Sequence, residues 1–341
     1  MKAPVLTAPQ TLELQDIEKP SIRDDEVLVK LSYCGICTLE QRLYTGAMKI
    51  FYPLVLGHEA SGRVEEVGSR VLSSLQPGTK VALDLVTRCN ECYFCRTGNS
   101  NLCENRFKKG QKVLGGFAEY IAVKATQVFP VPESLDLKIA AFAEPVACCI
   151  RSLQRLRLTL AEDLLIIGAG PMGLMHLQVA LAMGARVLVA DVNEKRLQDA
   201  LALGAFGTVN PAKEKLAEVV KERTEGRGAD ACVVTTAAHS ALKDAFDSVR
   251  KGGRINIYTS YGDAPELPMD ANTLHRNEYL VTGTEGRTAE DFHKAVRLLS
   301  FGIVKVDSLV SKTVSMEKAE EGIQAAMSEE TFRVLLAHGQ E

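Results

Sequence analysis

The sequence has no apolar run that reaches the roughly 18 residues needed to span a membrane. Residues 1–15 also lack the apolar core of a secretory signal peptide. Neither sign of charge dominates, since 40 lysines and arginines stand against 43 aspartates and glutamates, for a formal net charge of −3. Such a chain has no general attraction to nucleic acid or to an anionic membrane. We therefore expect a soluble, cytoplasmic protein with neither partner.

Internal repeats and low-complexity tracts are also missing. The 341 residues, of which 46% are hydrophobic and 24% charged, have the composition of an ordinary globular protein. Extended disorder, collagen and a disulfide-rich miniprotein are excluded. At about 150 residues per domain, the length predicts two domains.

The pattern of apolar residues changes along the chain. Before residue 137, short apolar runs broken by Gly and Pro turns predict strands. These runs include 27–31, 62–67 and 80–83. Apolar residues at helical spacing predict one helix over 137–158, with Pro145 as its one internal interruption.

From residue 164 onward, expected strands and helices alternate, which indicates a parallel sheet with helices on both faces. The strands are expected at 164–167, 187–190, 231–234, 254–258 and 278–281. The last part of the chain predicts helices at 289–300 and 316–327 and a strand near 332–336. The expected fold class is α/β, with a β-rich part before a doubly wound parallel sheet.

Nine cysteines are many for a reducing compartment, where clustered thiols bind metal more often than they form disulfides. Four of them follow the spacing C-x2-C-x2-C-x7-C: Cys89, Cys92, Cys95 and Cys103. A closed set of four thiolates is typical of structural zinc. A bacterial ferredoxin run differs, because its last cysteine follows sooner and precedes proline, whereas Cys103 precedes Glu104. We expect a structural zinc, with an iron–sulfur cluster or no metal as the alternatives.

A glycine-rich turn follows the strand expected at 164–167. It reads Gly168-Ala169-Gly170-Pro171-Met172-Gly173 and opens a helical run. Gly168 permits a tight turn, Gly170 lets the backbone approach a pyrophosphate, and Gly173 permits close packing of helix on strand. The start of the helix then offers free N–H groups and its positive dipole end to the phosphates. The turn predicts a dinucleotide site; the alternative is a doubly wound fold without a nucleotide.

Asp191 ends the next expected strand, 23 residues after Gly168. A carboxylate at this place hydrogen-bonds the ribose hydroxyls and repels the 2′-phosphate of NADP, so NAD is the expected cofactor. Arg196, one helical turn further on, is the side chain that could turn toward such a phosphate.

Cys37, His58 and Glu59 supply a thiol, an imidazole and a carboxylate, which are three kinds of zinc donor. Three protein donors with one open position are typical of catalytic zinc. Taken singly, each residue also has an ordinary interpretation, since a buried Cys is most often a small apolar residue and a buried His a hydrogen-bonded one.

Together, the motifs resemble the zinc-dependent medium-chain alcohol and polyol dehydrogenase superfamily over essentially the whole chain. They are Cys34-Gly35-Ile36-Cys37, the run from Gly57 to Gly68, the four-cysteine loop, the run from Gly115 to Tyr120, Glu144-Pro145 and the Gly168 turn. The resemblance implies a GroES-like catalytic domain at 1–150 with a zinc lobe at 89–103, a Rossmann domain at 151–285, and a segment 286–341 that returns to the first domain. It also implies a homodimer or homotetramer formed through the Rossmann domain.

By this resemblance, Cys37, His58 and Glu59 hold a catalytic zinc. Glu144 stands where the alcohol dehydrogenase branch has a second cysteine ligand, and Glu144-Pro145 resembles the sorbitol, threonine and sugar-alcohol branch, in which both acids contact zinc or its water. Glu59 and Glu144 would then exchange places during turnover. Zinc lowers the pKa of bound water from ~15.7 to ~7, and it would ease the ionisation of an alcohol in the same way.

The match departs just after Cys37. Relatives usually have Ser or Thr two residues after this cysteine, to pass the alcohol proton outward, and this chain has Leu39. Thr38 could substitute if its hydroxyl turned inward, but it is expected to point away, because adjacent residues of an extended segment face opposite sides. Two interpretations follow: Glu59 or Glu144 takes the proton, or the reaction differs from simple alcohol oxidation.

The resulting hypothesis is an enzyme that transfers hydride between NAD(H) and a secondary alcohol of a polyol, sugar acid or sugar phosphate. One alternative is a 3-hydroxy amino acid dehydrogenase of the threonine type. Another, from a different class, is a non-catalytic zinc-binding or nucleotide-binding module. A phosphorylated substrate would need cations such as Arg287 or those within 106–112, although such cations usually belong to solvated loops.

Overall fold

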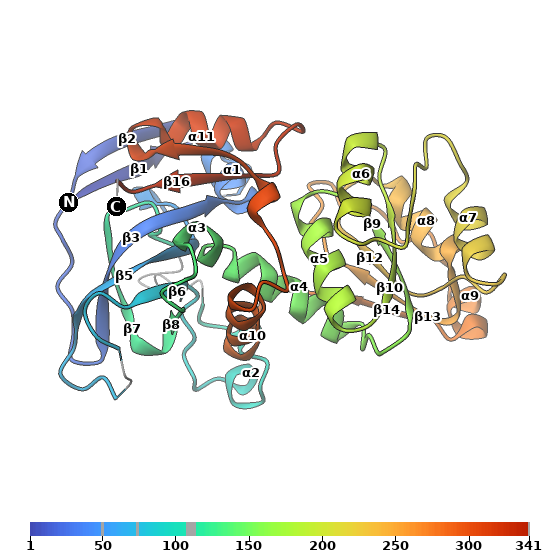
Figure 1. Cartoon of the computed structure of the whole chain (residues 1–341), viewed down its shortest axis with the longest axis horizontal. Helices are drawn as coiled ribbons and strands as arrows, with labels where there is room; N and C mark the ends of the chain where they lie inside the picture. The colour runs from blue at the N-terminus through green and yellow to red at the C-terminus, as the bar shows by residue number, and fades with distance from the viewer. Residues whose placement is uncertain (49–50, 73–74, 107–113, 340–341) are drawn as a thin grey trace. The chain divides into compact units, whose positions relative to one another are not determined.

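The computed structural model describes residues 1–48, 51–72, 75–106 and 114–339. The chain forms two compact units: unit 1 consists of Met1–Ala147 and Arg287–Glu341, and unit 2 of Cys148–Gly286 (Figure 1). Unit 2 is therefore an insertion in the chain of unit 1. The domain limits expected from the sequence stay a prediction. The two units divide the chain close to these limits.

Unit 1 is built on two sheets of mostly antiparallel strands. A small sheet has the order β2-β1-β4, and a seven-stranded sheet has the order β15-β16-β3-β5-β6-β8, with β7 also paired to β3. The strands are β1 (Lys2–Ala8), β2 (Thr11–Asp16), β3 (Glu26–Ile36), β4 (Leu54–Val55), β5 (Glu59–Val67), β6 (Lys80–Asp84), β7 (Tyr120–Lys124), β8 (Val128–Pro130), β15 (Val310–Ser315) and β16 (Arg333–Ala337).

The core of unit 1 lies along β3. Its alternate residues Val27, Val29 and Leu31 join one buried apolar cluster, which Val334 and Leu336 of β16 complete from the other end of the chain. Alternation places every second side chain on the same face of a strand, so one face of β3 packs against the core. The last strand of the chain, β16, thus lies in the same sheet as β3 and β5.

Among the described residues, six α-helices lie wholly or partly in unit 1. They are α1 (Thr38–Thr45), α2 (Tyr93–Arg96), α3 (Leu137–Ala140), α4 (Ala143–Arg155), α10 (Ala289–Ser300) and α11 (Ala319–Ala326). The single helix expected over 137–158 is wrong, because α3 and α4 are separate. Pro145 lies in the first turn of α4, where a missing N–H breaks no helical hydrogen bond. The helix expected at 289–300 is confirmed as α10.

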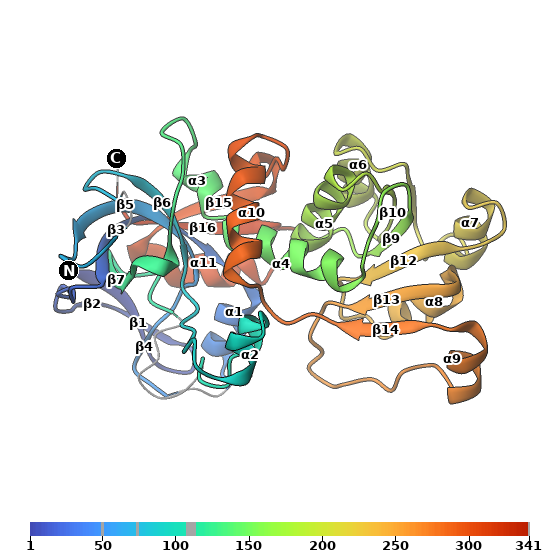
Figure 2. The same ribbon diagram turned by 90° about the horizontal axis from the view of Figure 1, so that it is seen from below.

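Unit 2 is a doubly wound parallel sheet (Figure 2). Its order is β11-β10-β9-β12-β13-β14, and all five neighbouring pairs are parallel. The strands are β9 (Asp163–Ile167), β10 (Arg186–Ala190), β11 (Gly207–Val209), β12 (Ala229–Val234), β13 (Val249–Ile257) and β14 (Leu280–Gly283). The helices that lie wholly in this unit are α5 (Pro171–Ala182), α6 (Glu194–Ala202), α7 (Leu216–Arg223), α8 (Ser240–Ser248) and α9 (Ala271–Asn277).

Helices cover both faces of this sheet. Leu165 and Ile167 of β9 pack in one apolar cluster with residues of α7 and α8. Helix α5 follows β9, α6 follows β10, and both cover the opposite face. Buried apolar strands between two helical layers are what the alternation in the sequence predicts. The α/β fold class is confirmed. Within the described ranges, no helix is long and apolar enough to cross a membrane.

Candidate active site and dinucleotide-binding turn

Cys37, His58 and Glu59 meet where β3 ends and β5 begins. These strands are antiparallel, and Gly35 pairs with Glu59 across them, so the end of one strand lies beside the start of the other. Each of the three residues offers one ligand atom within 4.8 Å of the other two. The structure thus brings together three of the four residues expected around the catalytic zinc.

Glu59 is buried against the backbone of β3. A Cβ atom at Gly35 would lie 2.0 Å from Glu59 Oε2, so only glycine leaves room for this carboxylate. Burial raises the pKa of Glu59 to about 7, although the nearby Arg333 guanidinium lowers it. Glu59 Oε1 lies 3.4 Å from Arg333 Nη2 and accepts no hydrogen bond. A buried carboxylate with such an oxygen, grouped with a thiol and an imidazole, fits a bound cation.

Glu40 fixes the orientation of His58. Its Oε1 lies 2.7 Å from His58 Nδ1, and its Oε2 accepts the N–H of Cys37 at 3.0 Å. The Glu40 side chain is completely buried. A carboxylate on Nδ1 leaves Nε2 as the donor atom of the ring, which is the usual support for a metal-binding histidine. This role of Glu40 was not predicted from the sequence, where an acid three residues after Cys37, at a helix start, was the signal for it.

The segment after Cys37 is helical rather than extended, so the expectation for Thr38 was wrong. Helix α1 begins at Thr38, and the Thr38 hydroxyl lies 3.7 Å from Cys37 Sγ. Leu39 packs against the apolar core of unit 1. A hydroxyl therefore lies beside the Cys37 thiol, on Thr38 rather than at position 39.

Glu144 lies beside this cluster, in the first turn of α4. Its Oε1 is 3.9 Å from His58 Nε2, and the same oxygen accepts a hydrogen bond from Arg287. Arg287 is 4% exposed and also pairs with Asp84 at 2.8 Å. Arg287 is thus buried in an ion-pair network rather than part of a solvated loop. The cations expected at 107–112 lie outside the described residues.

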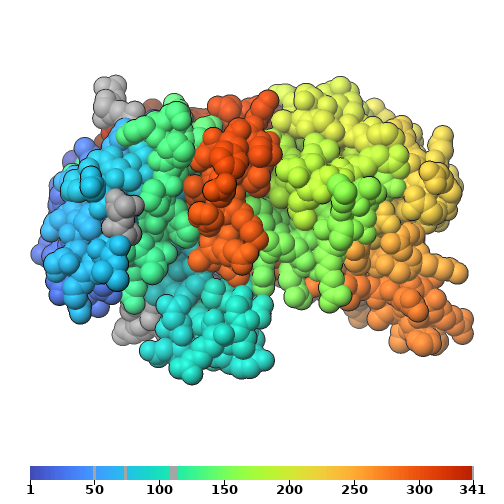
Figure 3. Space-filling view, turned by 60° about the horizontal axis from the view of Figure 1, so that its bottom comes forward, coloured from blue at the N-terminus to red at the C-terminus, as the bar shows by residue number. Residues whose placement is uncertain are grey.

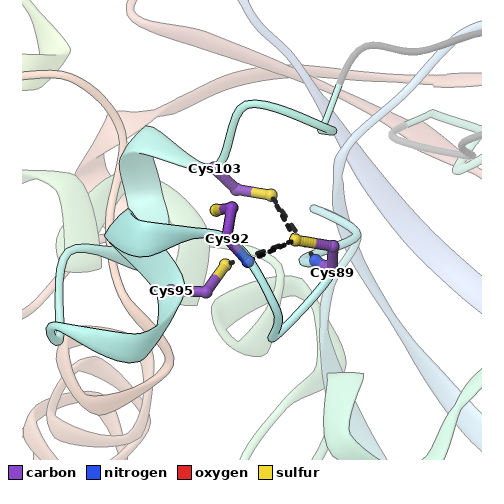
Figure 4. Close-up of side chains that lie close together, drawn as sticks. All are labelled: Cys89, Cys92, Cys95 and Cys103. Carbon is purple, nitrogen blue, oxygen red and sulfur yellow. Dashed lines mark hydrogen bonds between the residues drawn. The ribbon is translucent and has the colours of Figure 1, made fainter.

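The four cysteines of the loop converge (Figure 4). Cys89 Sγ lies 3.6 Å from Cys103 Sγ and 4.0 Å from Cys95 Sγ. Zinc–sulfur bonds of ~2.3 Å in a tetrahedron give sulfur–sulfur edges of roughly 3.8 Å, so the spacing fits zinc. Residues 89–103 form a protruding lobe on the surface of unit 1 (Figure 3).

Hydrogen bonds to sulfur favour the thiolate form in this lobe. The side chain of Asn105 and the N–H groups of Glu91 and Cys92 lower the pKa of Cys89 to about 6. Burial instead raises the pKa of Cys95 to about 12. A cation among the four sulfurs would offset this second effect, because metal binding requires deprotonated thiols.

The glycine turn joins β9 to α5 as expected. Gly168 has φ +107°, and a Cβ atom at Gly173 would lie 1.9 Å from the Gly168 carbonyl oxygen, so both positions require glycine. A Cβ atom at Gly170 would meet nothing within 4 Å, which leaves this stretch of backbone open to a ligand. Pro171 is the first residue of α5, and Met172 follows it with its carbonyl bonded to His176.

Asp191 lies beside this turn, and Arg196 lies in the helix that follows Asp191 in the chain. Asp191 Oδ2 accepts the N–H of Ala169 at 2.7 Å, which holds the carboxylate beside the turn. Arg196 lies in the first turn of α6, where its N–H is bonded to Asn193. The turn, the open helix start and the carboxylate form one cradle that fits a dinucleotide.

Known proteins match nearly the whole chain. Residues 23–133 match the alcohol dehydrogenase GroES-like domain family, and residues 171–300 match the zinc-binding dehydrogenase family. Sorbitol dehydrogenase of Bacillus subtilis (strain 168) is 32% identical over 333 residues, covering 96% of this chain and 94% of its own. D-arabitol-phosphate dehydrogenase of Enterococcus avium is 31% identical over 326 residues, covering 94% and 92%.

Among solved structures, the chain is similar to a protein of Sinorhizobium meliloti 1021, described as a zinc-binding dehydrogenase and bound to NADP. The TM-score is 0.92 at 27% identity, and the match covers 99% of both chains.

Proposed function

The chain belongs to the zinc-dependent medium-chain dehydrogenase family, and we propose that it oxidises a secondary hydroxyl of an uncharged polyol. It is an oxidoreductase that uses zinc and NAD(P), as expected from the sequence. In this proposal Cys37, His58 and Glu59 hold the catalytic zinc, with Glu144 beside it. When bound, the zinc makes an alcohol proton easier to remove, and the nicotinamide accepts hydride.

The residues around the three donors have separate tasks. Glu40 holds the ring of His58 so that Nε2 faces the cluster. Arg333 offsets part of the negative charge of Glu59. Glu144 is placed to take the alcohol proton, because its carboxylate lies next to His58 Nε2.

The charge balance of the site supports an uncharged substrate. Among the described residues, three buried arginines around the cluster are each paired with a carboxylate: Arg333 with Glu59, Arg287 with Glu144 and Asp84, and Arg88 with Asp84. None of these three guanidinium groups is left to hold a phosphate or an amino acid carboxylate, which need strong cationic partners. A polyol is therefore favoured over a sugar acid, a sugar phosphate or a 3-hydroxy amino acid.

The test is a screen for NADH formation with polyols, their phosphate esters, the matching sugar acids and L-threonine. We expect the highest kcat/KM with an unphosphorylated polyol. A higher value with a phosphate ester, a sugar acid or threonine would contradict the proposed substrate class. No turnover with any alcohol, at full zinc and NAD occupancy, would support a non-catalytic module.

We propose NAD rather than NADP as the cofactor, with Asp191 as the discriminating residue. The carboxylate beside Ala169 would accept hydrogen bonds from the ribose hydroxyls and repel a 2′-phosphate. Asp191→Gly should raise KM for NAD about 10- to 100-fold, since hydrogen bonds to a charged group are lost. Steady-state kinetics with both cofactors measure this. Arg196→Gln is the control and should leave the NAD kinetics unchanged; a native preference for NADP would contradict the assignment.

We propose a homodimer, or a homotetramer built from such dimers, that forms through strand β14. This strand is an edge of the unit 2 sheet, and its Leu280 is 40% exposed. An edge strand has unpaired N–H and C=O groups that a second copy can pair. Leu280→Lys should therefore convert the assembly to monomers in sedimentation velocity. Leu160→Lys, at a more exposed leucine before β9, is the control; unchanged assembly in Leu280→Lys would refute the interface.

We also propose that Cys89, Cys92, Cys95 and Cys103 hold a structural zinc and that the protein acts in the cytoplasm. All nine cysteines are free of disulfide bonds, which suits a reducing compartment. The four-sulfur spacing leaves no open position for a substrate.

A further inference from the structure

A buried chain of ion pairs connects Glu144 to the four-cysteine lobe. Arg287 donates to Glu144 through one nitrogen and to Asp84 Oδ1 through another, at 2.8 Å. Asp84 Oδ2 in turn accepts from Arg88 at 2.6 Å, and Arg88 immediately precedes Cys89. The side chains of Arg287, Asp84 and Glu144 are 4%, 1% and 7% exposed. Each carboxylate oxygen of Asp84 therefore accepts a hydrogen bond from a different arginine.

Arg287 is held both by its side chain and by its backbone. Arg88 Nη2 also donates to the carbonyl of Arg287 at 2.9 Å, so one arginine fixes the backbone of the other. The carbonyl of Asp84 accepts from the buried Gln127 at 3.0 Å. The guanidinium of Arg287 is planar and cannot lose its charge, so its two carboxylate partners are held in one fixed fork. The position of Glu144 thus depends on residues from β6 and from the start of the lobe.

The position of Glu144 matters because its carboxylate lies close enough to the three donors to bind the metal instead of Arg287. Its Oε1 is 3.9 Å from His58 Nε2, the ring atom that faces the three-donor cluster. Released from Arg287, the carboxylate would be a fourth donor, and an anionic one, next to a divalent cation, and ligation would satisfy its charge. A fourth protein ligand would close the position that a substrate alcohol requires.

We propose that Arg287 is a positioning residue: anchored by Asp84 and Arg88, it holds Glu144 off the catalytic metal and keeps the substrate position open. This inference rests on the proposed function, since it assumes zinc at Cys37, His58 and Glu59. The four-cysteine lobe then has a role beyond local stability. Arg88, at the start of the lobe, helps to fix the position of Glu144 through Asp84 and Arg287.

The test is the rate at which the labile zinc passes to a chromogenic chelator, measured without substrate on the zinc-loaded protein. Arg287→Gln should release this zinc more slowly than the native chain, because Glu144 becomes a ligand, while kcat falls about 10- to 100-fold. KM for NAD should not change. Faster zinc release in Arg287→Gln would overturn the proposal, because it would show that the arginine only stabilises the fold around the metal.

Three further variants make the result specific. Arg287→Gln combined with Glu144→Gln should release zinc at the rate of Glu144→Gln alone; a remaining slow release would overturn the role of Glu144. Arg88→Gln should slow release in the same direction, and it replaces Arg287→Gln if that variant does not fold. Arg254→Gln is the matched control, because it removes an arginine–glutamate pair, at 2.6 Å, from unit 2. Slow release in this control would also count against the proposal.

The same experiments separate this inference from the proposed function. A native chain that loads two zincs but oxidises no polyol contradicts the proposed substrate, and the zinc-release rates still decide the role of Arg287. If the native chain oxidises a polyol and Arg287→Gln releases zinc faster than the native chain, the proposed function is supported and only the role of Arg287 is overturned.

Discussion

A chain carrying His58→Ala is expected to hold one zinc instead of two and to lose alcohol oxidation. The proposed catalytic site has three close donors, and removal of one leaves a thiolate and a carboxylate that cannot retain the metal. The loss in kcat should exceed the ~100-fold that removing an outer-shell partner costs. Elemental analysis per chain, together with kcat on the best substrate, measures both effects.

Glu40→Gln is the matched comparison for His58→Ala. It keeps every donor atom and removes the carboxylate that orients His58 at 2.7 Å. We expect two zincs under zinc-saturating conditions and a loss of about 10- to 100-fold in activity or affinity for the metal. Two tightly held zincs in His58→Ala would mean that His58 is not a ligand.

Glu144→Gln is expected to lower kcat by about 10²- to 10⁴-fold while zinc content and NAD binding stay native. Glutamine keeps the size of the side chain and an oxygen, but it cannot take a proton. Glu59→Gln should instead lower the zinc content, because a neutral amide replaces a carboxylate among the three donors. Native turnover of Glu144→Gln at full zinc would remove Glu144 as the base.

Thr38→Val completes this experiment. The Thr38 hydroxyl lies 3.7 Å from Cys37 Sγ and is the alternative route for the alcohol proton. If Glu144 is the base, Thr38→Val should leave kcat unchanged. A large loss in Thr38→Val, with a small one in Glu144→Gln, would assign the proton route to Thr38.

Features that depend on neighbouring residues were predictable from the sequence. The cysteines at 89–103 and the turn at 168–173 bring their functional atoms together within one short segment, so spacing alone indicated both. The helix at 289–300 also needed only local periodicity, and its capping box at Thr288 and Asp291 fixes its start.

Features that depend on the tertiary fold were missed. Arg287 and Asp84 are 203 residues apart in the chain, and no local pattern relates them. Arg333 reaches Glu59 only because β16 pairs with β3. The expectation for Thr38 failed for a local reason: Glu40 accepts the N–H of Cys37 and starts a helix there, which periodicity over so short a segment does not reveal.

The placement of β16 in the middle of the unit 1 sheet has a consequence for synthesis of the protein. β16 lies between β15 and β3, so this sheet is complete only when residues 333–337 have left the ribosome. Unit 2 is continuous and can fold before that point, since domains generally fold as units during synthesis. Glu144 therefore lacks Arg287, and Glu59 lacks Arg333, until these residues have been synthesised, so both acids stay without these buried partners while unit 2 is being made. A chain that stops before residue 333 would therefore lack an inner strand of this sheet, and with it the arginine that faces the proposed zinc ligand Glu59.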